Sequence, residues 1–262
     1  MGSVRLGLYP RNVAIVVDCP GLARDYPAMV DIHEIARSPE EVAVRATLCL
    51  ALAMRGLLEG DAGGEDEAEA DTMRDQLREG LEREPRLWAA LQDEERDLLQ
   101  TPLGTANQEL AEEFIWAAEA GQVLLWALER RELPAHDEQE HPFKVAKSIG
   151  VISNVGGIPT NWLLLRSPRL RSVAEICELQ RSLTAIRSRL DLYAEDPEAA
   201  VDFEAFANRL GVHSELPQIA GDLSIEKQAI LHADEGSVAN AMAVASERQA
   251  GIDWLVGQPI IP

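Results

Sequence analysis

The sequence predicts a mainly α-helical protein, a single-domain helical bundle with short irregular or β segments near the N-terminus and around residues 149–166. Of its 262 residues 46% are hydrophobic, which is enough to fill a core. Aromatic residues make up only 5%, whereas alanine, leucine and glutamate are abundant, as helices prefer. No long linker divides the helical segments. We therefore expect an irregular arm over residues 1–37, one α-helical domain over 38–257 and a short tail over 258–262.

The first helix is expected after the irregular arm, which holds several prolines and glycines and one expected strand at residues 12–17. Ser38 is a good N-cap, Pro39 suits the first helical position, and Glu41 completes a capping box. Apolar residues then continue at helical spacing to about Gly56.

Three further helices are expected before the middle of the chain. An acidic, glycine-containing loop begins at Glu59 and leads into a polar helix over about residues 66–83. A short helix covers residues 85–100, and a long, almost wholly apolar helix covers about residues 106–131.

A connection rich in glycine, proline and asparagine follows over residues 136–169, with short strands expected at 150–153 and 162–165. Helical periodicity then returns. The segments in which it returns are residues 171–193, 197–210 (capped by Asp196), 224–232 and 236–256.

The charge of the chain bears on its partners. With 45 acidic against 24 basic residues the formal net charge is -21, which opposes binding to nucleic-acid phosphates and favours a basic protein partner. The alternative is that the acidity only keeps the protein in solution. The densest acidic run is the expected partner surface; it consists of Glu65, Asp66, Glu67, Glu69 and Asp71.

Motifs for metals, cofactors and catalysis are not found in the sequence. Cys19, Cys49 and Cys177 are far apart and form no CxxC pair, so neither zinc nor a disulfide framework is expected. HDEQEH at residues 136–141 matches no usual zinc spacing and is interpreted as a solvated acidic loop, and GVISNVGG lacks the pattern of a phosphate loop. No apolar run is long enough for a signal sequence or a membrane span, so a cytoplasmic protein without cofactors is expected.

Three charged residues fall on apolar helix faces when the helices are drawn as wheels. Glu119 lies near Trp116, Val123 and Trp126, and Arg45 and Arg248 also lie on apolar sides. A buried unpaired charge is costly, so we expect Glu119 to pair with Arg45, Arg248 or both. The alternative is a catalytic carboxylate in a cleft.

Four segments carry a resemblance to a family. They are W-x-x-E at Trp116 and Glu119, L-x-W-A-L at Leu124 to Leu128, R-S-x-x-E at Arg171 to Glu175, and E-R-x-A-x-x-x-W-L at Glu247 to Leu255. In this order and spacing the chain resembles, over roughly residues 37–257, the bacterial domain-of-unknown-function family 4272. The resemblance implies a helical cytoplasmic protein and carries no assigned activity.

Three functions remain open at the level of the sequence. The first is a non-catalytic interaction protein, such as an immunity or antitoxin-like inhibitor of a basic nuclease toxin. The second is an enzyme of unknown reaction with its site between the helices at Glu119, Arg45 and Arg248. The third is a structural or regulatory helical module.

An arginine-rich stretch over residues 166–189 could contact an anion, or its members could pair with neighbouring acids.

Overall fold

The computed structural model describes residues 35–64, 66–151, 163–199 and 201–257. Its fold is mainly α with a small antiparallel sheet near the C-terminus, so the predicted fold class is confirmed. The strand expected at residues 12–17, Cys19, the acidic Glu65 and the tail over residues 258–262 lie outside the described residues.

The helices are α1 (Pro39–Glu59), α2 (Glu67–Glu82), α3 (Pro85–Ala90), α4 (Asp93–Gln100), α5 (Gln108–Ala127), α6 (Pro142–Ser148), α7 (Val173–Glu195), α8 (Phe203–Arg209) and α9 (Glu235–Leu255). Two short 3-10 turns cover Leu163–Leu165 and Ile230–His232. The sheet is β1 (Gln218–Ile219), β2 (Asp222–Ile225) and β3 (Gln228–Ala229), in the order β1-β2-β3. Among the described helices, none combines the length and apolarity needed to cross a bilayer.

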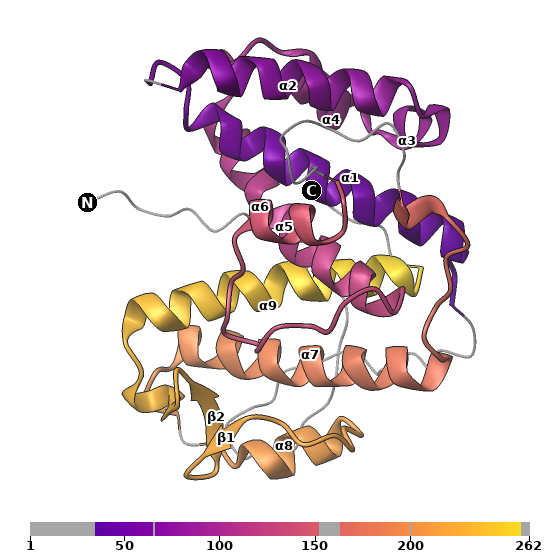
Figure 1. Cartoon of the computed structure of the whole chain (residues 1–262). Coiled ribbons are helices and arrows are strands. Elements are labelled where there is room, and N and C mark those ends of the chain that lie inside the picture. The colour runs from indigo at the N-terminus through magenta and orange to yellow at the C-terminus, as the bar shows by residue number, and fades with distance from the viewer. Residues whose placement is uncertain (1–34, 65, 152–162, 200, 258–262) are drawn as a thin grey trace.

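The elements are stacked in layers from one end of the molecule to the other (Figure 1). Helices α2, α3 and α4 cover α1, which packs on α5; α9 lies between α5 and α7, and α8 with the sheet closes the far end. Buried side chains form two hydrophobic clusters, one centred on α1 and α5 and the other between α7, α8, the sheet and α9. The order α1, α5, α9, α7 therefore forms the central axis of the fold.

Small residues let these central helices approach one another closely. A Cβ added at Gly56 of α1 would lie 2.5 Å from the carbonyl oxygen of Ala111 in α5. A Cβ added at Gly251 of α9 would lie 2.9 Å from the carbonyl oxygen of Ala120, also in α5. Both crossings thus depend on the absence of a side chain.

Helix α1 begins as the sequence predicts. The Ser38 hydroxyl accepts a hydrogen bond from the Glu41 N–H, and the Glu41 carboxylate accepts one from the Ser38 N–H. The preceding Arg37 stacks 5.0 Å above the ring of Trp254 and donates to its carbonyl oxygen, so the end of the arm that the structure describes is fixed to α9.

The prediction of a helix over residues 224–232 is wrong. This segment contributes to β2 and β3, joined by a turn at Glu226 and Lys227 with φ values of 46° and 64°. Such a two-residue turn normally contains glycine or asparagine, so the sequence carried no turn signal. Leu223 and Ile225, both fully buried, alternate as strand residues, and Ile230 begins the 3-10 turn.

Other boundaries also differ from the sequence expectations. Residues 85–100 form two helices, because the chain is extended at Leu91 and Gln92. Helix α8 begins at Phe203, capped by Asp202 instead of Asp196. The strand expected at residues 162–165 is replaced, from Leu163 onward, by a 3-10 turn.

The connection after α5 contains a helix that the sequence analysis missed. Helix α6 begins after His141, whose Nδ1 accepts a hydrogen bond from the Phe143 N–H. The strand expected at residues 150–153 is a turn at Gly150, and its remainder from residue 152 lies outside the described residues.

Candidate functional site

Glu119 lies in the middle of α5 with 1% of its surface exposed. Its Oε2 accepts a hydrogen bond of 2.9 Å from Nε of Arg248 in α9, and Nη2 of the same arginine lies 2.9 Å away. Its Oε1 accepts a hydrogen bond of 2.9 Å from the side-chain amide of Gln122. Both carboxylate oxygens are therefore occupied by donors from the core.

Arg248 binds more than the carboxylate. Its Nη1 donates to the carbonyl oxygens of Pro134 and Ala135, at 3.1 and 2.8 Å. Its Nη2 donates to the carbonyl oxygen of Glu138 at 2.9 Å. We call Arg248, Glu119 and these three carbonyls the arginine node. The node joins α5, α9 and the segment that follows α5.

The protonation of Glu119 is controlled by opposing effects. Burial raises the pKa of this carboxyl, and the adjacent Arg248 guanidinium opposes the rise. A raised pKa and a central position would suit a general acid or base, but such a group must reach a substrate. Glu119 and Arg248 are almost completely buried, and neither lines the two surface depressions near α8. The arrangement therefore has the chemistry of a structural pair.

Arg45 is not part of the node. Its Nη1 binds Oε1 of Glu95 at 2.6 Å, and Glu95 in α4 is 2% exposed. The other oxygen of Glu95 accepts from the Gln92 N–H and completes a capping box at the start of α4. The expected pair between Arg45 and Glu119 is thus replaced by one with Glu95. The capping-box spacing of Gln92 and Glu95 is visible in the sequence. The segment around Glu95 is highly polar, however, so nothing in the sequence indicated that Glu95 lies in the core.

The buried ion pair between Arg189 and Asp222 was missed entirely. Arg189 of α7 donates from Nε and Nη2 to the two oxygens of Asp222 in β2, both at 2.7 Å. Arg189 is 1% exposed and Asp222 is 6% exposed. The bidentate geometry fixes the sheet to α7. The sequence did contain a signal, because Arg189 lies beside the apolar Ile186 and Leu190. A charged residue on an apolar helix face is also what identified Arg45 and Arg248.

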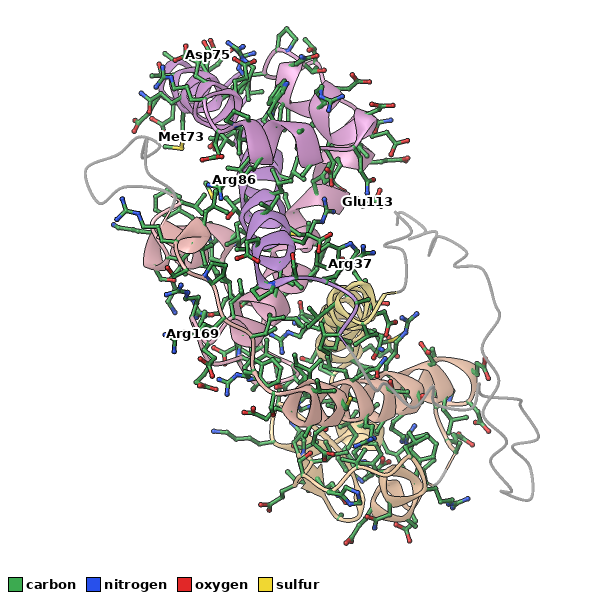
Figure 2. The ribbon with its side chains drawn as sticks, turned by 90° about the vertical axis from the view of Figure 1, so that its right-hand side faces the viewer. Arg37, Met73, Asp75, Arg86, Glu113 and Arg169 are labelled. Atoms are coloured by element: carbon green, nitrogen blue, oxygen red, sulfur yellow. The ribbon has the colours of Figure 1, made fainter. Side chains whose placement is uncertain are left out.

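The expected acidic partner surface lies at the start of α2, at one end of the molecule (Figure 1). Asp66, Glu67 and Glu69 are exposed and make no side-chain ion pair with any described residue. Asp71 instead pairs with Arg74 at 2.9 Å, and Arg74 also binds Asp75 at 2.9 Å. Figure 2 shows α2 and Asp75 at this end. We call Asp66, Glu67 and Glu69 the α2 acidic surface. Acids in a first helical turn also stabilise the helix dipole, which is a structural reason for part of this run.

The arginine-rich stretch over residues 166–189 mostly makes internal pairs. Four of its members have acidic partners: Arg171 with Glu132 and Glu175, Arg181 with Glu178, Arg187 with Asp191, and Arg189 with Asp222. Arg166 and Arg169 are exposed, and Figure 2 labels Arg169 at the side of the molecule. An anion site built from the whole stretch is therefore not formed.

The HDEQEH segment is more ordered than the expected solvated loop. Its backbone supplies a carbonyl to Arg248, and the Asp137 carboxylate accepts a hydrogen bond of 2.7 Å from the Glu226 N–H in the turn between β2 and β3. Glu140 is 8% exposed and binds Arg131 and Lys144. In the part of the chain that the structure describes, no three histidine, cysteine or acidic side chains gather as metal ligands.

Comparison with known proteins identifies a family. The family described as "Domain of unknown function (DUF4272)" matches residues 22–209. The matched range includes Arg45 and Glu119 but ends before Arg248 and the E-R-x-A-x-x-x-W-L segment that contributed to the resemblance in the sequence. No curated protein and no solved structure matches the chain.

Proposed function

The chain belongs to the DUF4272 family, whose description names no activity, and from this premise we propose that it is a non-catalytic acidic interaction protein. Its partner would be a basic protein, and the form of the interaction that we favour is inhibition of a basic nuclease toxin by an immunity or antitoxin-like protein. The α2 acidic surface would carry the contact.

One observation carries this proposal: the buried acids bind arginines of the core, whereas the acids of the α2 acidic surface have no ion-pair partner among the described residues. Glu119, Glu95 and Asp222 each bind a buried or largely buried arginine. Asp66 and Glu67, by contrast, are exposed without an ion-pair partner among the described residues. These exposed carboxylates are therefore available to bind a positively charged partner.

The expected physical behaviour follows from this charge distribution. A net charge of -21 attracts a basic partner over a distance of about 8–10 Å in physiological salt. Association would be fast and would slow as salt is added, because such steering acts mainly on the association rate. An enzyme that acts on a small molecule is not expected to bind a basic protein at a rate that depends on salt in this way.

The test is affinity capture from the native host, with the tagged chain as bait at low and at high salt. The expected result is one basic protein that is recovered at low salt, released at high salt, and inhibited in its own activity by the purified chain. Asp66→Asn, Glu67→Gln and Glu69→Gln combined should weaken this capture.

A matched control carries the same change in net charge at another place. Glu94→Gln, Asp97→Asn and Glu109→Gln neutralise three exposed acids of α4 and α5 and should leave the capture intact. Capture that is lost equally in both triple variants would show only an effect of net charge. Recovery of no basic protein by the unmodified chain would reject the proposed function.

A further inference from the structure

The second acidic feature of the surface is a groove at the opposite end of the molecule from α2. Helix α8, the loop after it and β1 form its walls, together with the segment that follows α5 (Figure 1). Its lining residues include His136, Glu204, Glu215, Leu216, Pro217 and Gln218. The depression continues along α8 past Ala207 and Val212. We call it the α8 groove.

The charged groups of the α8 groove carry one sign. Glu204 and Glu215 are exposed, and neither has a hydrogen-bond or ion-pair partner among the described residues. Among the residues that the structure describes, no lysine or arginine lines the groove. The carboxylates therefore present acceptors for which the described part of the chain supplies no donor.

A further polar group belongs to His136, whose side chain is only 10% exposed. Its Nδ1 lies 3.8 Å from Oδ1 of Asp137, which is too far for a hydrogen bond. Burial lowers the pKa of this imidazole, and Asp137 and the Ser224 backbone oppose the change. Its Nε2 is buried without a hydrogen-bond partner among the described residues. A buried polar atom without a partner is costly, and a ligand can remove that cost.

The walls of the groove also include apolar surface. Leu216 and Val212 are buried, and Pro217 and Ala207 lie beside them. A ligand that fits must therefore combine an aliphatic part with a cationic head that donates several hydrogen bonds. Arginine has this combination: its stem packs on apolar surface while its guanidinium presents five N–H groups and no acceptor.

We propose that the α8 groove binds an arginine side chain of a protein partner, with Glu204 and Glu215 facing the guanidinium and Leu216 beside its stem. This inference rests on the proposed function, because it names the chemical group through which a basic partner would be held. The groove and the α2 acidic surface lie at opposite ends of the molecule, so each can be changed without altering the other (Figure 1).

The test is a titration of the full chain with a short arginine-rich peptide, followed by NMR of the backbone amides and histidine rings. Shifts are expected at His136 and at the amides of residues 204–218. The same peptide with citrulline in place of arginine should not bind, because citrulline keeps the shape of arginine and lacks its charge. A lysine peptide should bind more weakly, and equal binding by it would overturn the assignment to a guanidinium.

Glu204→Gln combined with Glu215→Gln should weaken peptide binding roughly tenfold, as expected when two exposed ion pairs are lost. Both residues are exposed, so the fold should be unaffected. The matched control is Glu67→Gln with Glu69→Gln, which makes the same charge change at the other end and should leave binding within about twofold. Equal weakening by both pairs, or peptide shifts confined to α2, would overturn the proposal.

The capture experiment separates this inference from the proposed function. A basic protein whose capture survives Glu204→Gln and Glu215→Gln but fails with the α2 variants would reject the groove and support the function. Peptide binding in the groove without capture of any basic protein would support the groove and reject the function.

Discussion

Arg248 places its Nε and Nη2 at 2.9 Å from the same oxygen of Glu119, while Gln122 occupies the other oxygen. The arginine thus has an Nη1 and part of Nη2 free for main-chain carbonyls, and it uses them on the segment after α5. One ion pair therefore fixes two helices and a connection at once.

Glu119→Gln should destabilise the fold. The change removes the charge that neutralises Arg248 in a buried place, and the expected cost is about 3 to 5 kcal/mol of unfolding free energy. Urea denaturation of both proteins measures it. Glu109→Gln, an exposed change in the same helix, should have little effect. An unchanged midpoint for Glu119→Gln would contradict the structural role of the node.

Asp222→Asn should loosen the far end of the molecule. Without the carboxylate, Arg189 keeps a buried charge with no counterion, at a cost of about 3 to 5 kcal/mol. Hydrogen exchange should show the largest gain in β2 and α8, with a smaller gain in α1. Arg169→Lys, an exposed change, serves as the control. Uniform exchange across the chain would show that the two clusters unfold together.

Gly251→Ala should weaken the crossing of α9 and α5. The new methyl group would lie 2.9 Å from the carbonyl oxygen of Ala120, and overpacking of this kind costs about 1 to 3 kcal/mol. Thermal denaturation should show a lower midpoint than for Ala239→Ser, which alters an exposed position of the same helix. A midpoint equal to that of the unmodified chain would mean that the helices can separate without loss.

Glu247→Gln should change how stability depends on pH. Burial, aided by Glu113, raises the pKa of Glu247 from 4.5 to about 7. The unfolded chain loses this proton first as pH rises, so the contribution of the protonated group is complete below about pH 4.5 and is lost through pH 7. The loss is about 3 kcal/mol at most. The variant should therefore gain stability over the unmodified chain at pH 8 but not at pH 4.

Denaturation at several pH values measures this difference. Glu94→Gln, an exposed change in α4, should leave the pH profile unchanged. If the difference in unfolding free energy between Glu247→Gln and the unmodified chain is constant from pH 4 to pH 8, Glu247 has the same pKa in the folded and the unfolded chain.

Local sequence signals predicted the parts of the fold that depend on neighbours in the chain. The start of α1 follows from Ser38, Pro39 and Glu41, and the buried charges follow from the wheel positions of Arg45 and Arg248. The hairpin at residues 222–229 could not be predicted, because Glu226 and Lys227 adopt positive φ values that these residue types rarely take. Their conformation is held by Asp137, which is 89 residues away in sequence.

The partners of the buried charges show the same limit. A wheel identifies a buried charge but contains no information on what faces it across the helix packing. Glu119 lies in an apolar helix and could be identified, whereas Glu95 lies in the charged run DEERD and could not be distinguished from its neighbours. Asp222, in a short strand, had no helical face at all.

Each hydrogen bond that Arg248 donates to residues 134–138 goes to a main-chain carbonyl and not to a side chain. Substitutions at Ala135 or Glu138 that keep the backbone in place should therefore be tolerated. Insertion or deletion of a single residue would move the carbonyls out of register with the guanidinium. The length of this connection, more than its composition, is therefore what the contact with Arg248 requires.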